Sequence, residues 1–254
     1  MKEKTSITLS RDLLAGIDQL AGHQRSRSAF IERVLRRYLR ERARAQSHAR
    51  DLERINQAAD RLNSEVADVL ELCDSARRLS SGWFDPWSMP GGLDPTGLVK
   101  GWAAAQALAP LIDAAVDGAM VNAGGDVASF GRPHRGASWH IGVTDPFDRS
   151  RLLCVVESPG AVATSGTYER GAHLIDPFTG KARTRWRSAT VVGADLALAD
   201  ALATGLCVAG ADGTAAIEAV GYTAIVVDDA GTVRLIGNPP VVEGVPAGKA
   251  IRLG

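Results

Sequence analysis

Polar and apolar positions alternate near the start of the chain. Residues 5–9 switch between the two types at every step, a spacing typical of a short strand. Ser10 then offers a hydroxyl that can cap a helix, because apolar residues follow at helical spacing and Gly22 ends the run. After an Arg-Ser turn at residues 25–28, a second helix is predicted from an apolar stripe made of Phe30, Ile31, Val34, Leu35, Tyr38 and Leu39.

Charge separates this strand, helix, helix unit from the rest of the chain. Residues 1–50 hold 12 Lys and Arg against 5 Asp and Glu, although the whole chain has 29 of each type. A basic surface of this kind favours a polyanionic partner, because Lys and Arg near phosphates release condensed counterions. The unit is also too small to bury a sufficient core by itself, so we expect residues 1–45 to form a homodimer.

The remainder of the chain contains two segments that differ in composition. Residues 46–70 are charged, Ala-rich and free of Gly and Pro, which predicts a helical arm or linker. From residue 71 onward, short segments rich in Val, Ile and Ala alternate with Gly and Pro clusters, as in a mixed α/β domain. We therefore predict an α+β protein with three parts, which are residues 1–45, 46–70 and 71–254.

The cysteines and the apolar runs bear on the compartment. Cys73, Cys154 and Cys207 are odd in number and widely separated, so they suggest neither a disulfide framework nor a CxxC metal site. The first residues contain no apolar segment of signal-peptide type, and no uncharged apolar run reaches about 18 residues. We expect a soluble, cytoplasmic protein.

The basic head, residues 2–41, resembles the ribbon-helix-helix DNA-binding family, which includes bacterial antitoxins and plasmid copy-number repressors. In that family two chains pair their strands into a ribbon that enters the major groove of duplex DNA. Carried over by position, the side chains that contact bases would be Lys4, Ser6 and Thr8. The alternative is that these three residues only solvate an edge strand. The order of strand, cap, glycine and Arg-Ser turn favours DNA binding.

Two further features of the head and arm follow from this resemblance. The second helix would hold a DNA phosphate on its free N–H groups near Arg27 and Ser28. Residues 50–71 resemble the antitoxin arm that wraps a toxin partner, and a plain solvated spacer helix is the alternative. A partner surface could bury the sparse apolar positions of the arm, which are Leu52, Ile55, Leu62, Val66, Val69 and Leu70.

Five sequence blocks in one order carry a second resemblance. Together they resemble the FAD:protein FMN transferase family, often called ApbE-like, over roughly residues 70–238. The family breaks the pyrophosphate of FAD, attaches FMN to a Thr or Ser of an acceptor protein, releases AMP and requires magnesium. The blocks are SSGWFDP, LDPTGLVKGW, VNAGGDV, VATSGTYERGAHLIDPFTG and LALADALATGL.

The resemblance implies a set of cofactor-binding residues. By the family pattern, Asp94 contacts the flavin nucleotide and Lys100 lies beside it. Trp83, Phe84 and Asp85 match the segment in which aromatic bulk and a carboxylate flank the nucleotide. From the residues alone, Asp94 could equally form a turn before a proline, and the two aromatic residues could be ordinary core.

The resemblance also implies a magnesium site. Asp200 and Thr204 are four residues apart on a predicted helix, so both oxygens project from the same face and can approach one hard cation. By the family pattern, the carbonyl of Gly97 is the third protein ligand. Without the family, Asp200 would more often be a solvated helix residue.

Three further positions lie in the blocks that carry the resemblance. The family places a functionally important histidine before Ile-Asp-Pro, so His173 is the candidate for acid/base work, with a core histidine as the alternative. Ser165 resembles part of the loop near the acceptor. Asp126 follows two glycines, and from the residues it is as easily a turn or strand cap.

One departure from the family leaves two functions open. Relatives carry a strand and a helical segment before the first block, whereas here the head and arm stand in that place, and residues 50–71 show no β alternation. We therefore expect an exposed sheet edge and a half-open cofactor pocket. The chain is either an FMN transferase with a DNA-binding head, or an antitoxin-like transcriptional regulator that carries a degraded or flavin-sensing transferase remnant.

Overall fold

The computed structural model describes residues 10–21, 26–28, 30–31, 34–35, 64–89, 92–134, 137–166, 174–244 and 250–253. The chain divides into two compact units, residues 1–58 and 59–254, and each is described here by itself. Several sequence predictions lie outside the described residues, namely the strand at residues 5–9, the DNA-contacting Lys4, Ser6 and Thr8, and His173.

The N-terminal unit is helical where it is described. Helix α1 spans Arg11–Ala21, and Ile17 is its buried apolar residue. The described residues of the second predicted helix, which lie between 27 and 35, are also helical. The guanidinium of Arg27 donates to both carboxylate oxygens of Asp18, at 2.5 and 2.6 Å, and this bond lowers the pKa of Asp18. Arg27 is therefore paired within the chain, apart from any contact with the DNA phosphate that the sequence predicted near it.

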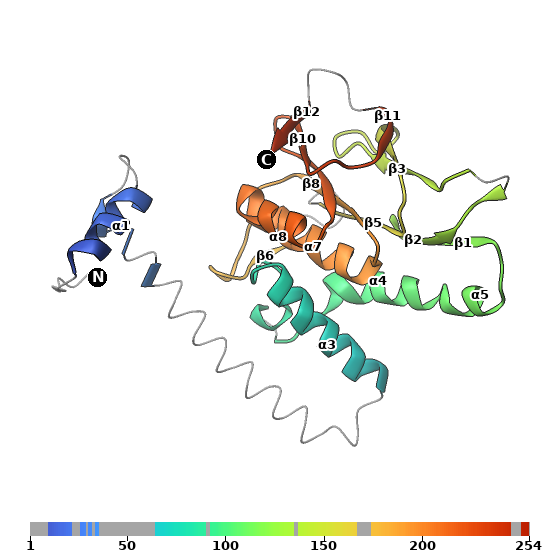
Figure 1. Ribbon diagram of the computed structural model, residues 1–254, viewed down its shortest axis with the longest axis horizontal. Helices are drawn as coiled ribbons and strands as arrows, with labels where there is room; N and C mark the ends of the chain where they lie inside the picture. Colours follow the sequence, from blue (N-terminus) through green and yellow to red (C-terminus); the bar gives the residue numbers. More distant parts are fainter. Residues whose placement is uncertain are drawn as a thin grey trace. The chain divides into compact units, whose positions relative to one another are not determined.

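A seven-stranded sheet organises the C-terminal unit (Figure 1). Its neighbouring strands are antiparallel, except that β10 and β12 run parallel. In the described part of the chain β1 and β12 are the outer strands. The strands, in spatial order, are β1 (Gly118–Ala123), β2 (Asp126–Gly131), β5 (Ala161–Gly166), β8 (Ser188–Gly193), β9 (Thr223–Val227), β10 (Val233–Ile236) and β12 (Ala250–Leu253).

Two smaller sheets complete the β structure. A three-stranded sheet has the order β11 (Val241–Gly244), β4 (Leu152–Glu157) and β3 (His140–Thr144). Its inward side chains form one core with residues of the large sheet, including Val127, Val162, Val192 and Ile225. A two-stranded sheet pairs β6 (Ile175–Asp176) with β7 (Lys181–Ala182).

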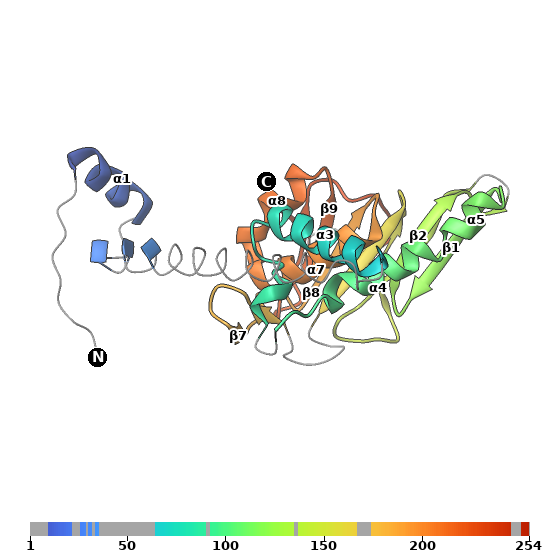
Figure 2. The same ribbon diagram turned by 90° about the horizontal axis from the view of Figure 1, so that it is seen from below.

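Helices cover the other face of the large sheet, and Figure 2 shows α3, α4 and α7 gathered on that side. Helix α7 (Leu196–Ala209) is apolar nearly all round, so it can be buried on every side, and it packs against β5 and β8. Asp195 caps α7 by accepting the N–H of Leu198 at 2.8 Å. The other helices are α3 (Ser64–Leu79), α4 (Thr96–Gln106), α5 (Ala109–Asp113), α8 (Thr214–Ala219), and the 3-10 turns η2 (Pro86–Ser88) and η4 (Gly210–Gly213).

Among the described residues, one helical stretch is long and apolar enough to cross a membrane. It runs over Leu196–Ala219, and 78% of its most apolar window is buried inside the fold. The core helix of a globular fold passes the same test of length and composition.

Helix α3 crosses the boundary that the sequence analysis placed at residue 70. Val69 and Leu70, interpreted from sequence as part of an arm that a partner would cover, are buried within the C-terminal unit itself. The buried stripe continues through Cys73 and Ala76, and it packs against α4 and α7. Small side chains complete this stripe, which is why its apolar pattern looked sparse.

Candidate functional site

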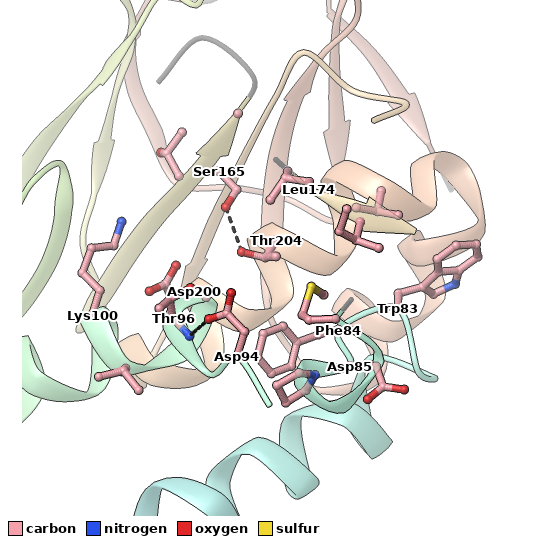
Figure 3. Close-up of a pocket in the computed structure, with 18 residues that line it drawn as sticks. Trp83, Phe84, Asp85, Asp94, Thr96, Lys100, Ser165, Leu174, Asp200 and Thr204 are labelled. Carbon is pink, nitrogen blue, oxygen red and sulfur yellow. Dashed lines mark hydrogen bonds between the residues drawn. The ribbon is translucent and has the colours of Figure 1, made fainter. Parts of the chain in front are cut away.

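A cavity of about 370 Å³ lies beside α4, α7 and the end of β5. All of the cofactor and metal residues predicted from the sequence line it, namely Trp83, Phe84, Asp85, Asp94, Gly97, Lys100, Asp200 and Thr204. Figure 3 places Lys100 at one end and Trp83 at the other, with Asp200, Thr204 and Ser165 between them. The structure therefore brings the predicted residues together, while their individual roles stay predictions.

Two glycines allow α4 to approach α7 closely. A Cβ on Gly101 would lie 2.4 Å from the carbonyl oxygen of Leu196, a distance that backbone packing cannot accommodate without a shift. One turn earlier, a Cβ on Gly97 would lie 3.2 Å from Oγ1 of Thr204 and 3.2 Å from the ring of Phe84. Residues at i and i+4 share a helix face, so this glycine pair sets the separation of the two helices at the cavity.

Asp200 and Thr204 reach the cavity from α7, one turn apart. Asp200 is 2% exposed, and its carboxylate accepts the N–H of Gly101 at 3.2 Å. In a regular helix this N–H donates to the carbonyl of Gly97, so the carboxylate and the carbonyl compete for the same donor. Oγ1 of Thr204 is 2.9 Å from Oγ of Ser165, a hydrogen bond drawn in Figure 3. A carboxylate and two hydroxyls from α7 and β5 thus lie in the lining of the cavity beside the first turn of α4.

Metal ligation at this spot would depend on few side chains. No group of three or more His, Cys, Asp or Glu residues within the described ranges is placed to hold an ion. The donors available are the carboxylate of Asp200, the hydroxyl of Thr204 and the carbonyl of Gly97. These are hard oxygen ligands, and a small cation that keeps several waters or phosphate oxygens needs only one or two carboxylates.

The aromatic end of the cavity is formed by the segment that follows α3 in the chain. Phe84 is buried and packs in the core that α3, α4 and α7 share, so its ring supports the cavity wall from beneath. The ring of Trp83 meets Phe178 edge-on with centroids 4.5 Å apart, and the guanidinium of Arg185 lies 5.6 Å from its centroid. Asp85 is buried and accepts the N–H of Trp87 at 3.1 Å, which caps η2.

Asp94 has the local role that its sequence context also allowed. Its Oδ1 accepts the N–H of Thr96 at 3.0 Å, a turn that leads directly into α4 (Figure 3). The side chain is exposed and lines the cavity. Asp94 can therefore both start the helix and face a ligand.

Asp126 does not line the cavity but pairs with Lys100, which does, and the sequence did not predict this pairing. Asp126 lies at the start of β2, is 1% exposed, and Nζ of Lys100 is 2.6 Å from its Oδ2. Its Oδ1 accepts the N–H of Thr164 on β5 at 2.9 Å. The block that contains Asp126 was part of the family pattern, but its pairing with Lys100 joins two separate blocks and depends on the fold.

Cys207 lies behind the cavity on α7. Its thiol donates to the carbonyl of Ser165 at 3.1 Å, and burial raises its pKa to about 12. Burial likewise raises the pKa of Cys73 to about 12 and that of Cys154 to about 11. All three thiols are free and protonated at neutral pH, so none is suited to act as a nucleophile there.

Comparison with protein families assigns both units of the chain. Residues 88–227 match the model of the ApbE family, and residues 3–42 match that of the ribbon-helix-helix protein, copG family.

Curated relatives match part of the C-terminal unit. The FAD:protein FMN transferase of Rhodobacter capsulatus is 39% identical over 127 residues, which are 46% of this chain and 24% of that protein. The FAD:protein FMN transferase of Vibrio cholerae is 34% identical over 139 residues, which are 50% of this chain and 42% of that protein. The chain thus spans less than half the length of these relatives.

Solved structures share the fold. The ApbE protein of Thermotoga maritima superposes with a TM-score of 0.61 at 23% identity, over 68% of this chain and 75% of that one. The flavin transferase ApbE of Vibrio cholerae gives a TM-score of 0.58 at 22% identity, over 73% of this chain and 76% of that one. These likenesses place the C-terminal unit in a known mixed α/β architecture.

Proposed function

Because the chain belongs to the ApbE family, we propose that its C-terminal unit is an FAD:protein FMN transferase. It would break the pyrophosphate of FAD, join FMN to a Thr or Ser hydroxyl of an acceptor protein, and release AMP. The curated relatives that match it carry this activity in their names. The observation that carries the proposal is the cavity itself, since residues from four of the five sequence blocks line it and place polar groups beside an aromatic wall.

The cavity suits a dinucleotide with a charged centre. Trp83 and the buried Phe84 supply an aromatic end, while Lys100 supplies a cation at the other end. Helix α4 begins at Thr96, so the positive end of its dipole lies near the same region. A cation and a helix dipole that are fixed before the reaction stabilise charge that builds on a transferring phosphoryl group.

We further propose that magnesium binds between α4 and α7. The carbonyl of Gly97, the carboxylate of Asp200 and the hydroxyl of Thr204 would hold it, and the buried carboxylate beside two hydroxyls fits a hard cation. When bound, the ion would neutralise charge on the phosphates of FAD. The hydrogen bond between Ser165 and Thr204 would orient the Thr204 hydroxyl toward it.

The transfer also requires proton handling. As the acceptor oxygen bonds to the FMN phosphorus, the bond from that phosphorus to the AMP oxygen breaks, and the acceptor proton must leave. His173 stays the predicted acid/base group on the strength of the family pattern, and it lies outside the described residues.

Release of AMP from FAD tests the proposed activity. The full chain is incubated with FAD, with and without magnesium, and AMP is separated by chromatography. We expect magnesium-dependent release that Asp200→Ala reduces by orders of magnitude, because the only anionic ligand is lost. Asp212→Ala is a matched control, since this exposed carboxylate pairs with Arg185 and does not line the cavity. Undiminished release from a folded Asp200→Ala variant would refute the metal assignment.

For the head, we propose that two copies bind duplex DNA. The match of residues 3–42 to a ribbon-helix-helix family and the basic charge of residues 1–50 support this proposal. Apolar Leu13, Val34 and Leu35 are exposed in the single chain, as expected if a second copy covers them. A toxin partner for the arm is a further proposal on the antitoxin resemblance alone.

DNA binding by the full chain is measured by titration with labelled duplex at several salt concentrations. We expect affinity to fall steeply with salt, and Ser6→Ala with Thr8→Ala to weaken preference for a cognate operator more than general affinity. A chain that stays monomeric and has no affinity at low salt would contradict this. If wild-type protein binds DNA and releases no AMP, the regulator with a transferase remnant is the better account.

A further inference from the structure

The pairing of β2 with β5 ends one residue short of Asp126. The ladder contains Val127 with Val162 and Ala128 with Ala161, and the next position of β2 is Asp126. At this position the Asp126 side chain continues the hydrogen bonding between the two strands in place of the backbone, because its Oδ1 accepts the N–H of Thr164. A main-chain donor of a core strand therefore fixes where this carboxylate points.

The other oxygen of Asp126 is directed to α4. Its Oδ2 lies 2.6 Å from Nζ of Lys100, whose side chain is 32% exposed and lines the cavity, while that of Asp126 is 1% exposed. If Lys100 moved away, the buried carboxylate would be left as an uncompensated charge, and this cost keeps the ammonium beside Asp126. The carboxylate of Asp126 is anchored by the N–H of Thr164, whereas Lys100 has a long, partly exposed side chain, so Asp126 contributes to the position of the Lys100 ammonium.

The same turn of α4 is held from a second side. The N–H of Gly101, the residue after Lys100, donates to Asp200 on α7. Two buried carboxylates from different elements therefore fix adjacent residues of α4, one through the side chain and the other through the backbone. The ammonium of Lys100 is thereby placed relative to the proposed phosphate region, and it needs little rearrangement when charge develops.

We propose that Asp126 is a positioning residue of the transferase site, which acts on the reaction by holding the Lys100 ammonium beside the phosphates of FAD. This inference rests on the proposed function of the cavity. The charge of Asp126 has two opposite effects on the proposed site. The Asp126 carboxylate repels the pyrophosphate and so weakens binding of FAD, whereas its hold on Lys100 speeds the transfer. Replacement of a residue needed only for folding would not change FAD affinity and kcat in opposite directions.

A double-mutant cycle on the full chain separates these roles. The variants are Asp126→Asn, Lys100→Met and the double variant, with FAD affinity measured by flavin fluorescence, kcat by AMP release and stability by thermal denaturation. Asn keeps an oxygen for the N–H of Thr164 and removes only the charge. We expect Asp126→Asn to lower kcat by about tenfold or more while FAD binds equally well or more tightly.

The coupling between the two residues gives the decisive comparison. If Asp126 acts through Lys100, the double variant is no slower than Lys100→Met alone. The inference would be overturned if the kcat losses of the two single variants multiply in the double variant. It would also be overturned if Asp126→Asn leaves kcat unchanged, or if FAD affinity falls together with kcat in that variant. If Asp126→Asn does not fold, Lys100→Arg replaces it, because Arg keeps the charge and changes its geometry. An unchanged kcat in Lys100→Arg would then overturn positioning.

The outcome for the wild-type protein separates this inference from the proposed function. If the wild type neither binds FAD nor releases AMP, the proposed function fails and the inference fails with it. If the wild type is active and the cycle shows independent effects, only the role of Asp126 is refuted.

Discussion

Replacement of Gly101 by Ala tests how finely the contact between α4 and α7 sets the site. The new Cβ would begin 2.4 Å from the carbonyl oxygen of Leu196 and 2.9 Å from its carbonyl carbon, and both are backbone atoms. Relief to at least about 3.0 Å requires a shift of about 0.6 Å, because side-chain carbons in cores do not approach more closely. The shift must move a helix, since no flexible side chain can yield.

The expected energies follow from two opposing terms. Overpacking of a close contact typically costs about 1–3 kcal/mol, whereas Ala in place of Gly within a helix recovers up to about 1 kcal/mol. We therefore expect the free energy of unfolding to fall by about 1–2 kcal/mol. Gly97 lies one turn from Gly101 and faces Thr204, so the same movement widens the proposed metal site. A misplacement near 1 Å can cost about a hundredfold in rate, so we expect AMP release to fall about tenfold.

The assay combines urea denaturation with AMP release at saturating FAD. Gly16→Ala is the matched control, because Gly16 lies within α1 and a Cβ there meets nothing within 4 Å. That variant should keep full transferase activity. A Gly101→Ala protein with wild-type stability and rate would show that the helices tolerate separation, and the argument from their contact would be wrong.

Other predictions concern α7 and the buried thiols. Asp195→Ala should lower the free energy of unfolding by about 1 kcal/mol in urea, because it removes the cap of α7. Thr204→Val, which keeps the volume and removes the oxygen, should lower magnesium-dependent AMP release. Cys207 has a folded pKa of about 12, above the unfolded value near 8.5, so its stabilisation is complete below about pH 8.5 and is lost at about 1.4 kcal/mol per pH unit above it. Urea titrations at pH 7 and pH 10 measure this loss together with the losses from Cys73 and Cys154, whose pKa values burial also raises. A thiol reagent at pH 7 should modify only unfolded protein.

Sequence motifs predicted the family and the fold class, and the residues that they assigned to the cofactor and the metal line one cavity. The two family resemblances and the mixed α/β architecture are confirmed by the family matches and the shared fold. Motif blocks carry this information because each block is short and contiguous, and the cavity is built where the blocks meet. Residues as far apart as Trp83 and Thr204 could therefore be assigned to one pocket without knowledge of the path between them.

What the sequence did not predict depends on three-dimensional proximity or on small side chains. The Lys100 and Asp126 pair joins two blocks, and either residue alone has an ordinary local explanation. The buried face of α3 uses Cys73 and Ala76, which contribute little to a hydrophobic pattern, so the helix was assigned partly to an arm. The roles of His173 and of the DNA-contacting residues stay predictions, since they rest on the family pattern.

The burial of α7 has a consequence for how such a site can change. Nearly every residue of this helix is enclosed, and the helix carries both Asp200 and Thr204. A substitution on α7 therefore disturbs the core before it alters chemistry, whereas other residues of the cavity lining, such as Trp83, Asp94 and Ile175, lie in short segments outside the long helices. Variation in the proposed substrate can be accommodated in those segments without rebuilding the proposed ion site. The two parts of the cavity lining would thus have different roles, with the enclosed helix keeping the proposed reaction and the short segments setting which substrate binds.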